Sequence, residues 1–248
     1  MSTDYYDIDS FFKKYLSWRE NQFSANELVE KPNFLRMLPD VKNKRILDLG
    51  CGFGDYSRFL YDMGAKEVVG IDASEKMIQR AKENKGERNI SYYRMPIEEI
   101  SFDKNSFDLV ISNIVIHYIE DVNQLFKKIN ELITKEGTFV FSTEHPTSTA
   151  SYNLGWQLDE KTGEQIYWRL DNYGIPGPRE TNWMEHVFIK YHRTIGNYCD
   201  ALIDNGFAIK RINEAVPTQE DIEKNTELKK YLKRPLYLII KAQKSDDN

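Results

Sequence analysis

The chain has 248 residues, of which 40% are hydrophobic and 29% are charged, and its formal net charge is −5. This length is enough to bury a sizeable core, and the acidic balance argues against a uniformly basic nucleic-acid-binding surface. No apolar run approaches the roughly 20 residues of a membrane span. The first residues do not have the pattern of a signal peptide, and two cysteines form neither a disulfide framework nor a metal cluster. We therefore expect a cytoplasmic protein without a bound metal and without nucleic-acid or membrane partners.

Residues 1–43 carry apolar side chains at helical spacing. Phe11, Tyr15 and Trp18 recur three to four residues apart, which favours an amphipathic helix. Pro39 then breaks the pattern. We expect this stretch to form a helical cover over the rest of the chain.

Residues 44–144 alternate apolar strands with helices. Ser74 is a candidate N-cap for the helix after the second strand. The predicted strands cover 45–49, 67–72, 90–95, 107–113 and 137–144. This alternation predicts an α/β fold, with a parallel sheet covered by helices on both faces.

Residues 145–193 depart from this alternation and hold three of the four tryptophans. The aromatic residues of the stretch include Tyr152, Trp156, Tyr167, Trp168, Tyr173, Trp183, Phe188 and Tyr191. We interpret the stretch as an aromatic lid inserted into the core. Its rings either form a small core of their own or line a ligand cavity.

Residues 194–248 return to the alternation and complete the core. Strands are predicted over 207–213 and 235–243, and we expect them to pair antiparallel at the sheet edge. The whole chain, 1–248, is thus predicted to be a single domain with seven strands.

A glycine-rich segment, Asp48-Leu-Gly-Cys-Gly-Phe-Gly54, lies between the first strand and a helix. Open parallel sheets bind ligands beyond the carboxyl ends of their strands, and glycine lets the backbone turn sharply against a ligand. Asp72 closes the second strand, 18 residues past Gly54, which suits binding to both hydroxyls of a ribose. This pattern fits a nicotinamide dinucleotide or S-adenosylmethionine (SAM).

Two details of the segment favour SAM. The glycine spacing is G-x-G-x-G, whereas dinucleotide-binding loops have G-x-G-x-x-G. A carboxylate at Asp48 would repel a pyrophosphate but attract the amino and sulfonium groups of SAM.

The segments LDLGCGFG, VVGIDASEKMIQRAK and NSFDLVISNIVIHYIED resemble the class I SAM-dependent methyltransferases over residues 44 to 144. The resemblance implies a Rossmann-like, seven-stranded, mostly parallel sheet of order 3-2-1-4-5-7-6, with the last strand antiparallel. It implies that SAM contacts Gly50, Gly52, Asp72, Ala73, Met77 and Asn113.

One position departs from the pattern of that family. Pro96 stands where an aspartate often binds the adenine amino group. We expect the adenine contact to come from the backbone of Ile97 or from Glu98.

The lid resembles a narrower group of bacterial methyltransferases. The resemblance is carried by Glu144-His145-Pro146 and by the run KYHRT at 190–194. This group implies no particular reaction, so the acceptor is left open as a small molecule of unknown identity.

Methyl transfer from a sulfonium mainly requires proximity and alignment. A base is needed only where the nucleophile starts protonated. His117, His145 and His192 follow strand four, strand five and the lid, and are candidate catalytic bases with near-neutral pKa. A lone histidine is more often structural than catalytic, but three near one expected cleft favour a catalytic role as a group. Glu144 is a further candidate for a base or for a brace of the lid.

Three alternatives compete with a small-molecule methyltransferase. An RNA or other macromolecule methyltransferase is disfavoured because Asn113 is followed by Ile-Val-Ile, not by the Pro-Pro-aromatic stretch of base-methylating enzymes. A non-catalytic SAM-binding protein is compatible with the same fold. A nicotinamide-dependent oxidoreductase is the weakest of the three.

Overall fold

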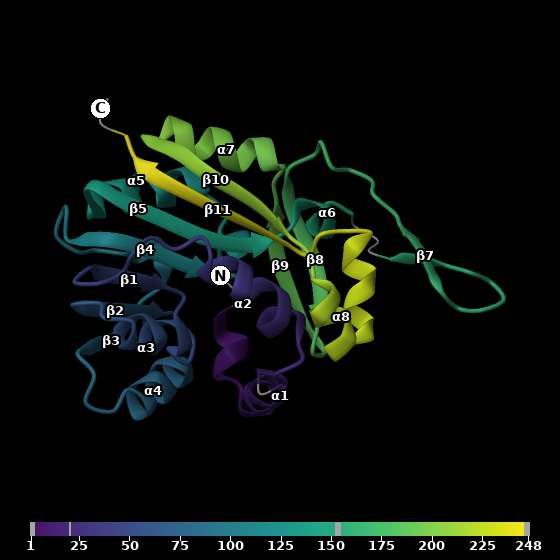
Figure 1. The fold of residues 1–248 in the computed structure, drawn as a ribbon, viewed down its shortest axis with the longest axis horizontal. Coiled ribbons are helices and arrows are strands. Elements are labelled where there is room, and N and C mark those ends of the chain that lie inside the picture. Colours follow the sequence, from purple (N-terminus) through teal and green to yellow (C-terminus); the bar gives the residue numbers. More distant parts are fainter. Residues whose placement is uncertain (1–2, 20, 152–154, 246–248) are drawn as a thin grey trace.

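The computed structural model describes residues 3–19, 21–151 and 155–245. Within these ranges the main sheet has seven strands in the order β10-β11-β5-β4-β1-β2-β3 (Figure 1). Its strands are β1 (Arg45–Leu49), β2 (Glu67–Asp72), β3 (Ile90–Arg94), β4 (Phe107–Asn113), β5 (Ile133–Glu144), β10 (Phe207–Ala215) and β11 (Tyr237–Lys244). Counted along the chain, β10 and β11 are the sixth and seventh strands of this sheet. The order is therefore 3-2-1-4-5-7-6 from the other side, and the predicted strand order is confirmed.

The pairing of β1 brings three loops together where the central parallel strands end. We call this carboxyl-terminal side of the sheet the edge. Strand β1 pairs in parallel with β2 and with β4, and Leu49 lies opposite both Ile71 and Ser112. The residues that follow these three in the chain are Gly50, Asp72 and Asn113, so they meet at this edge. Strand β11 pairs antiparallel with both β5 and β10, which confirms the predicted direction of the last strand.

Helices cover both faces of the sheet because the strands are apolar on both sides. One buried cluster joins the sheet to α5 and α7, and the other joins it to α2, α3 and α4. These helices are α2 (Lys31–Leu35), α3 (Asp55–Asp62), α4 (Glu75–Asn84), α5 (Val122–Leu132) and α7 (Ile195–Asp204). Ser74 accepts a hydrogen bond from the Met77 backbone and caps α4, as the sequence predicts.

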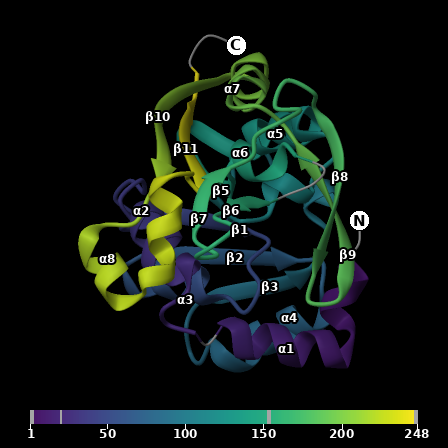
Figure 2. The same cartoon turned by 90° about the vertical axis from the view of Figure 1, so that its right-hand side faces the viewer.

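The N-terminal cover packs against the lid. It consists of η1 (Thr3–Asp7), α1 (Asp9–Arg19), a π-helical turn η2 (Asn26–Glu30) and α2. The Phe11 ring lies 5.7 Å from Trp183 and 5.6 Å from Phe188, both in the lid. Segments far apart in the sequence therefore close over the same edge of the sheet (Figure 2).

The lid consists of a short helix and two hairpins. Its elements are α6 (Pro146–Thr149), β6 (Trp156–Leu158), β7 (Gln165–Trp168), β8 (Gly177–Trp183) and β9 (His186–His192). The β8–β9 hairpin lies beside the sheet edge, whereas the β6–β7 hairpin projects away from the body (Figure 1). Of these two hairpins, β8–β9 is therefore the one placed to cover a site at the carboxyl ends of the strands. Tyr152, one of the predicted lid aromatics, lies outside the described residues.

Short helices complete the described chain. They are η3 (Ile97–Glu99), η4 (Ile116–Tyr118), α8 (Gln219–Lys224) and η5 (Thr226–Leu232). None of the helices in the described ranges is long and apolar enough to cross a membrane.

Candidate functional site

A cavity of about 320 Å³ lies at the carboxyl ends of the central strands. On the sheet side it is lined by Gly50–Phe53, Asp72–Ser74, Ile97 and Asn113–Val115, which lie at or just after the ends of β1, β2, β3 and β4. The N-terminal cover and the β8–β9 hairpin supply the opposite wall. The topology of the sheet therefore places the cavity where a parallel α/β fold binds its ligand.

The glycines after β1 serve two different purposes. Gly50 has a φ of +72°, and a Cβ there would lie 2.4 Å from Cγ2 of Val115. Gly52 also has a positive φ, +53°, but among the described atoms none lies within 4 Å of its added Cβ. Gly50 is thus required by packing, whereas Gly52 leaves free space next to the cavity that it lines.

Asp72 presents its carboxylate at the same edge. One oxygen accepts a hydrogen bond from the Gly52 backbone at 3.0 Å, and the other accepts one from the Ser74 backbone at 2.9 Å. Burial raises the pKa of Asp72 to about 6, although the backbone hydrogen bonds lower it. Each oxygen keeps a lone pair, so the carboxylate can accept two hydroxyl groups from a ligand.

Most of the predicted cofactor residues lie in the cavity wall. Those that line it are Gly50, Gly52, Asp72, Ala73, Met77, Ile97 and Asn113. The amide nitrogen of Asn113 donates to Glu30, and its buried carbonyl oxygen has no hydrogen-bond partner in the described part of the chain. That oxygen is an acceptor available to a ligand.

Two predicted cofactor residues, Asp48 and Glu98, are not among the described residues that line the cavity. Asp48 is buried and accepts a hydrogen bond from the Ser57 hydroxyl at 2.6 Å. Burial raises its pKa to about 7. Asp48 therefore braces the start of α3 against β1. Of Ile97 and Glu98, the two proposed adenine contacts, only Ile97 reaches the cavity.

The three candidate catalytic histidines are likewise not among the described lining residues. The ring nitrogens of His145 lie 2.8 Å from Glu214 and 2.8 Å from Thr147. Those of His192 lie 2.8 Å from the Thr149 hydroxyl and 2.9 Å from the Tyr173 carbonyl. The His145 ring thus joins the lid to β10 of the sheet, and the His192 ring joins segments of the lid to one another.

His117 packs against Tyr118 and lies close to Glu144, and both of these residues line the cavity. It is fully buried, and burial lowers its pKa to about 4. Its Nδ1 accepts a hydrogen bond from the Glu144 backbone at 3.4 Å. Its Nε2 has no hydrogen-bond partner among the described residues and lies 4.0 Å from Oε1 of Glu144. Glu144 lines the cavity, so His117 lies behind that carboxylate and outside the described lining.

Glu144 and Lys190 form an ion pair in the cavity wall. Nζ of Lys190, from β9, lies 2.6 Å from Oε1 of Glu144, at the end of β5. Burial raises the pKa of Glu144, but Lys190 and His117 outweigh it and hold the pKa below its ordinary value. The pair therefore joins the lid to the sheet as two opposite charges.

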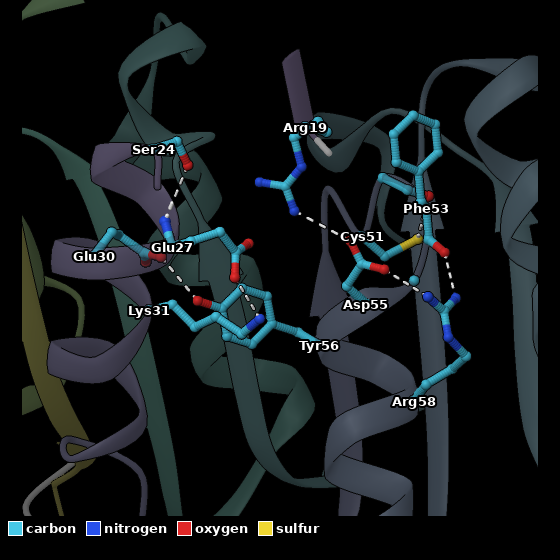
Figure 3. Close-up of polar contacts among 12 residues, drawn as sticks. Arg19, Ser24, Glu27, Glu30, Lys31, Cys51, Phe53, Asp55, Tyr56 and Arg58 are labelled. Carbon is cyan, nitrogen blue, oxygen red and sulfur yellow. Dashed lines mark hydrogen bonds and ion pairs between the residues drawn. The ribbon is translucent and has the colours of Figure 1, made fainter. Parts of the chain in front are cut away.

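A second ion pair joins the N-terminal cover to the glycine-rich segment. Arg19 lies 3.1 Å from Asp55 at the start of α3, and Arg58 lies 2.5 Å from the same carboxylate (Figure 3). Arg58 also donates to the Phe53 carbonyl at 2.6 Å. Tyr15, Trp18 and Arg19 all line the cavity, in the predicted cover.

Glu30 is a lining residue that the sequence does not reveal. It is 3% exposed and lies in the π-helical turn η2. Its carboxylate accepts hydrogen bonds from the Tyr56 hydroxyl at 2.8 Å, Asn113 at 3.0 Å and Ser142 at 2.6 Å. Its only sequence signal is an acidic residue one helical turn before Phe34, which is too common a pattern to indicate a site.

No group of three potential metal ligands occurs among the described residues. The arginines of the lid are also committed to the protein. Arg179 donates to the Ala150 and Ile175 carbonyls at 2.9 and 2.6 Å, and Arg193 donates to the Ile119 carbonyl at 2.6 Å. Arg179 therefore holds segments of the lid together, and Arg193 fixes the lid to the core.

Comparison with known proteins gives consistent results. Residues 47–141 match a family described as a methyltransferase domain. The crystal structure of an S-adenosylmethionine-dependent methyltransferase from Mesorhizobium loti is 40% identical, covers 89% of this chain and 98% of its own, and superposes with a TM-score of 0.82. An uncharacterized protein of Haemophilus influenzae is 35% identical over 96% of both chains. A malonyl-[acyl-carrier protein] O-methyltransferase of Legionella pneumophila is 30% identical, over 53% of this chain and 46% of its own length.

Proposed function

Because the chain belongs to the SAM-dependent methyltransferases, we propose that it transfers the methyl group of SAM to a small-molecule acceptor in the cavity described above. The observation that carries this proposal is the position of Asp72 and Gly52 at one edge of the cavity. A carboxylate with free lone pairs stands beside a backbone segment where a side chain is missing. This arrangement fits a ribose and an adjoining methionine chain.

We assign the cofactor contacts by position in the cavity. Asp72 would bind the ribose hydroxyls, and Ala73, Met77 and Ile97 would flank the adenine. Gly50 and Gly52 would lie against the methionine part. The carbonyl oxygen of Asn113, which has no hydrogen-bond partner among the described residues, would accept from the amino group. Bound SAM supplies a methyl group on a sulfonium, which leaves readily as a neutral thioether.

The chain's own residues position the acceptor and exclude water. Rings from the N-terminal cover and from the β8–β9 hairpin, including Tyr15, Trp18, Trp183 and Phe188, form an apolar side of the cavity. A dry cavity strengthens electrostatic contacts and keeps water from competing for the methyl group. Of the candidate histidines, we propose that His117 is a positioning residue that acts through Glu144. We propose that His145 and His192 hold the lid.

Calorimetric titration with S-adenosylhomocysteine (SAH) tests the cofactor site. We expect the wild type to bind, and Asp72→Ala to bind about 10- to 100-fold more weakly, because a charged hydrogen-bond acceptor is worth about 1.5–3 kcal/mol. Asp62→Ala is a matched control, since Asp62 lies at the far end of α3, is paired with Arg88 and is outside the described lining. Equal affinity in wild type and Asp72→Ala would show that the ribose contact is misassigned.

A further inference from the structure

We infer that the acceptor is an amine, bound with its nitrogen against the Glu30 carboxylate. This inference rests on the proposed function, because it names the substrate of the same cavity. Glu30 lines the cavity from η2 and is tied to the ends of β4 and β5 through Asn113 and Ser142. It therefore stands at the ends of β4 and β5, next to Asn113 and farther along the sheet than the glycine-rich segment after β1.

The charges in the cavity wall support a cationic acceptor. Asp55 is paired with Arg19 and Arg58, and Glu144 is paired with Lys190. Glu30, in contrast, accepts only from neutral hydroxyl and amide groups, and no ion pair involves it among the described residues. The nearby charge of Arg19 acts on it from a longer distance, because Arg19 is paired with Asp55. A buried carboxylate without a counter-ion is costly, and an ammonium group supplies the missing charge.

The rings around Glu30 favour the same class of ligand. Tyr56 donates to Glu30, and Tyr237, which also lines the cavity, donates to Asn26 in the same turn. Further along the wall the Trp183 ring lies 5.6 Å from Trp18 and 5.8 Å from Tyr15. Aromatic faces attract cations, and this attraction is stronger in a desolvated site.

An acidic acceptor fits this wall less well. The cations that line it, Arg19 and Lys190, are both held in ion pairs. A carboxylate ligand would have to break one of these pairs and would lie near the unpaired charge of Glu30. An alcohol would leave that charge without a partner.

The reaction balances with Glu30 as the proton acceptor. The ammonium nitrogen gives one proton to the Glu30 carboxylate, and its lone pair forms the new N–C bond while the C–S bond of the methyl group breaks. Sulfur keeps that electron pair, and Glu30 releases its proton to water. Burial raises the pKa of Glu30, which makes the carboxylate a better base for this step.

The test uses three probes of matched shape on the wild type saturated with SAH. They are phenethylamine, 2-phenylethanol and phenylacetate, and calorimetry gives the affinity of each. We expect the amine to bind about tenfold or more tightly than either of the others, as one buried ion pair requires. Absence of amine binding, or equal affinity for the alcohol or the acid, would overturn the inference.

Two variants assign the effect to Glu30. Glu30→Gln keeps the shape and the acceptor oxygen for Asn113 and Ser142, so we expect SAH binding within about threefold of wild type and amine binding about tenfold weaker. Glu27→Gln is the matched control, because Glu27 lies on the same turn but is not among the described residues that line the cavity. Its carboxylate is paired with Lys31 at 2.7 Å (Figure 3). An amine affinity that survives Glu30→Gln would contradict the inference. Failure of the wild type to bind SAH would instead contradict the proposed function.

Discussion

The cavity has two parts that are held by different kinds of contact. The cofactor half contains Gly50, Gly52 and Asp72, and the acceptor half contains Glu30, Glu144 and Lys190. In the cofactor half, Asp72 is fixed by backbone N–H groups of Gly52 and Ser74, and the loop shape is set by glycines with positive φ. In the acceptor half, Glu30, Glu144 and Lys190 are fixed by side-chain hydrogen bonds and charges between distant segments. Substitutions in the cofactor half should therefore affect SAH binding. Substitutions in the acceptor half should affect how the lid and the N-terminal cover are attached.

The largest expected effect separates two glycines within the cofactor half. Gly50→Ala should lower the free energy of unfolding by about 2–5 kcal/mol, because a left-handed conformation and a clash with Val115 add together. Gly52→Ala should cost only about 1–2 kcal/mol of strain, but its methyl group enters the space beside the cavity and should weaken SAH binding. Urea denaturation and SAH titration of both variants check this. Equal stability losses would contradict the distinct purposes assigned to the two glycines.

The next effect concerns the acceptor half. Lys190→Met leaves the charge of Glu144 without its partner, and we expect a loss of about 2–3 kcal/mol in the free energy of unfolding at pH 7. SAH affinity should change little, because Lys190 comes from the lid and the cofactor contacts come from the sheet edge. The double variant Lys190→Met/Glu144→Gln should recover most of the stability. If Lys190→Met instead abolishes SAH binding while the protein stays folded, the division into two halves is wrong.

Much of the cofactor half could be predicted from the sequence, since its residues lie in short segments directly after strands. The alternation of strands and helices indicates which loops meet at the sheet edge, and Gly50, Gly52, Asp72 and Asn113 are all in these loops. Asp48 is different because its position in the loop does not show where its side chain points. It turns inward to Ser57, which only the packing of α3 decides.

The acceptor half could be predicted only in outline. The aromatic lid and the helical cover follow from composition and spacing, but their contacts join residues that are far apart in the chain. Glu30 and Ser142 are 112 residues apart, for example. The histidines are near the expected edge in sequence, yet His145 and His192 turn toward Glu214 and Tyr173. Such choices depend on tertiary packing that no local pattern records.

The smallest expected effect is a pH dependence of the free energy of unfolding, to which a buried histidine and two buried aspartates contribute in opposite directions. His117, beside the lid, has its pKa lowered from 6.5 to about 4 by burial. The unfolded chain takes up a proton here between pH 6.5 and 4, while the folded one does not, so the stability from His117 is complete above pH 6.5 and is lost as the pH falls. Asp48 and Asp72 have raised pKa values, near 7 and 6, so their contributions increase over the same acid range.

The change in stability of the wild type alone therefore mixes both contributions, and a comparison with His117→Asn isolates the histidine. The asparagine amide can accept the Glu144 N–H in place of Nδ1 but does not titrate. From pH 7 to pH 4.5 the wild type should lose about 2 kcal/mol more than His117→Asn, as a shift of this size implies. Urea denaturation of both proteins at the two pH values measures the difference. Parallel losses would contradict the lowered pKa, because they would mean that His117 takes up its proton in the folded protein as readily as in the unfolded chain.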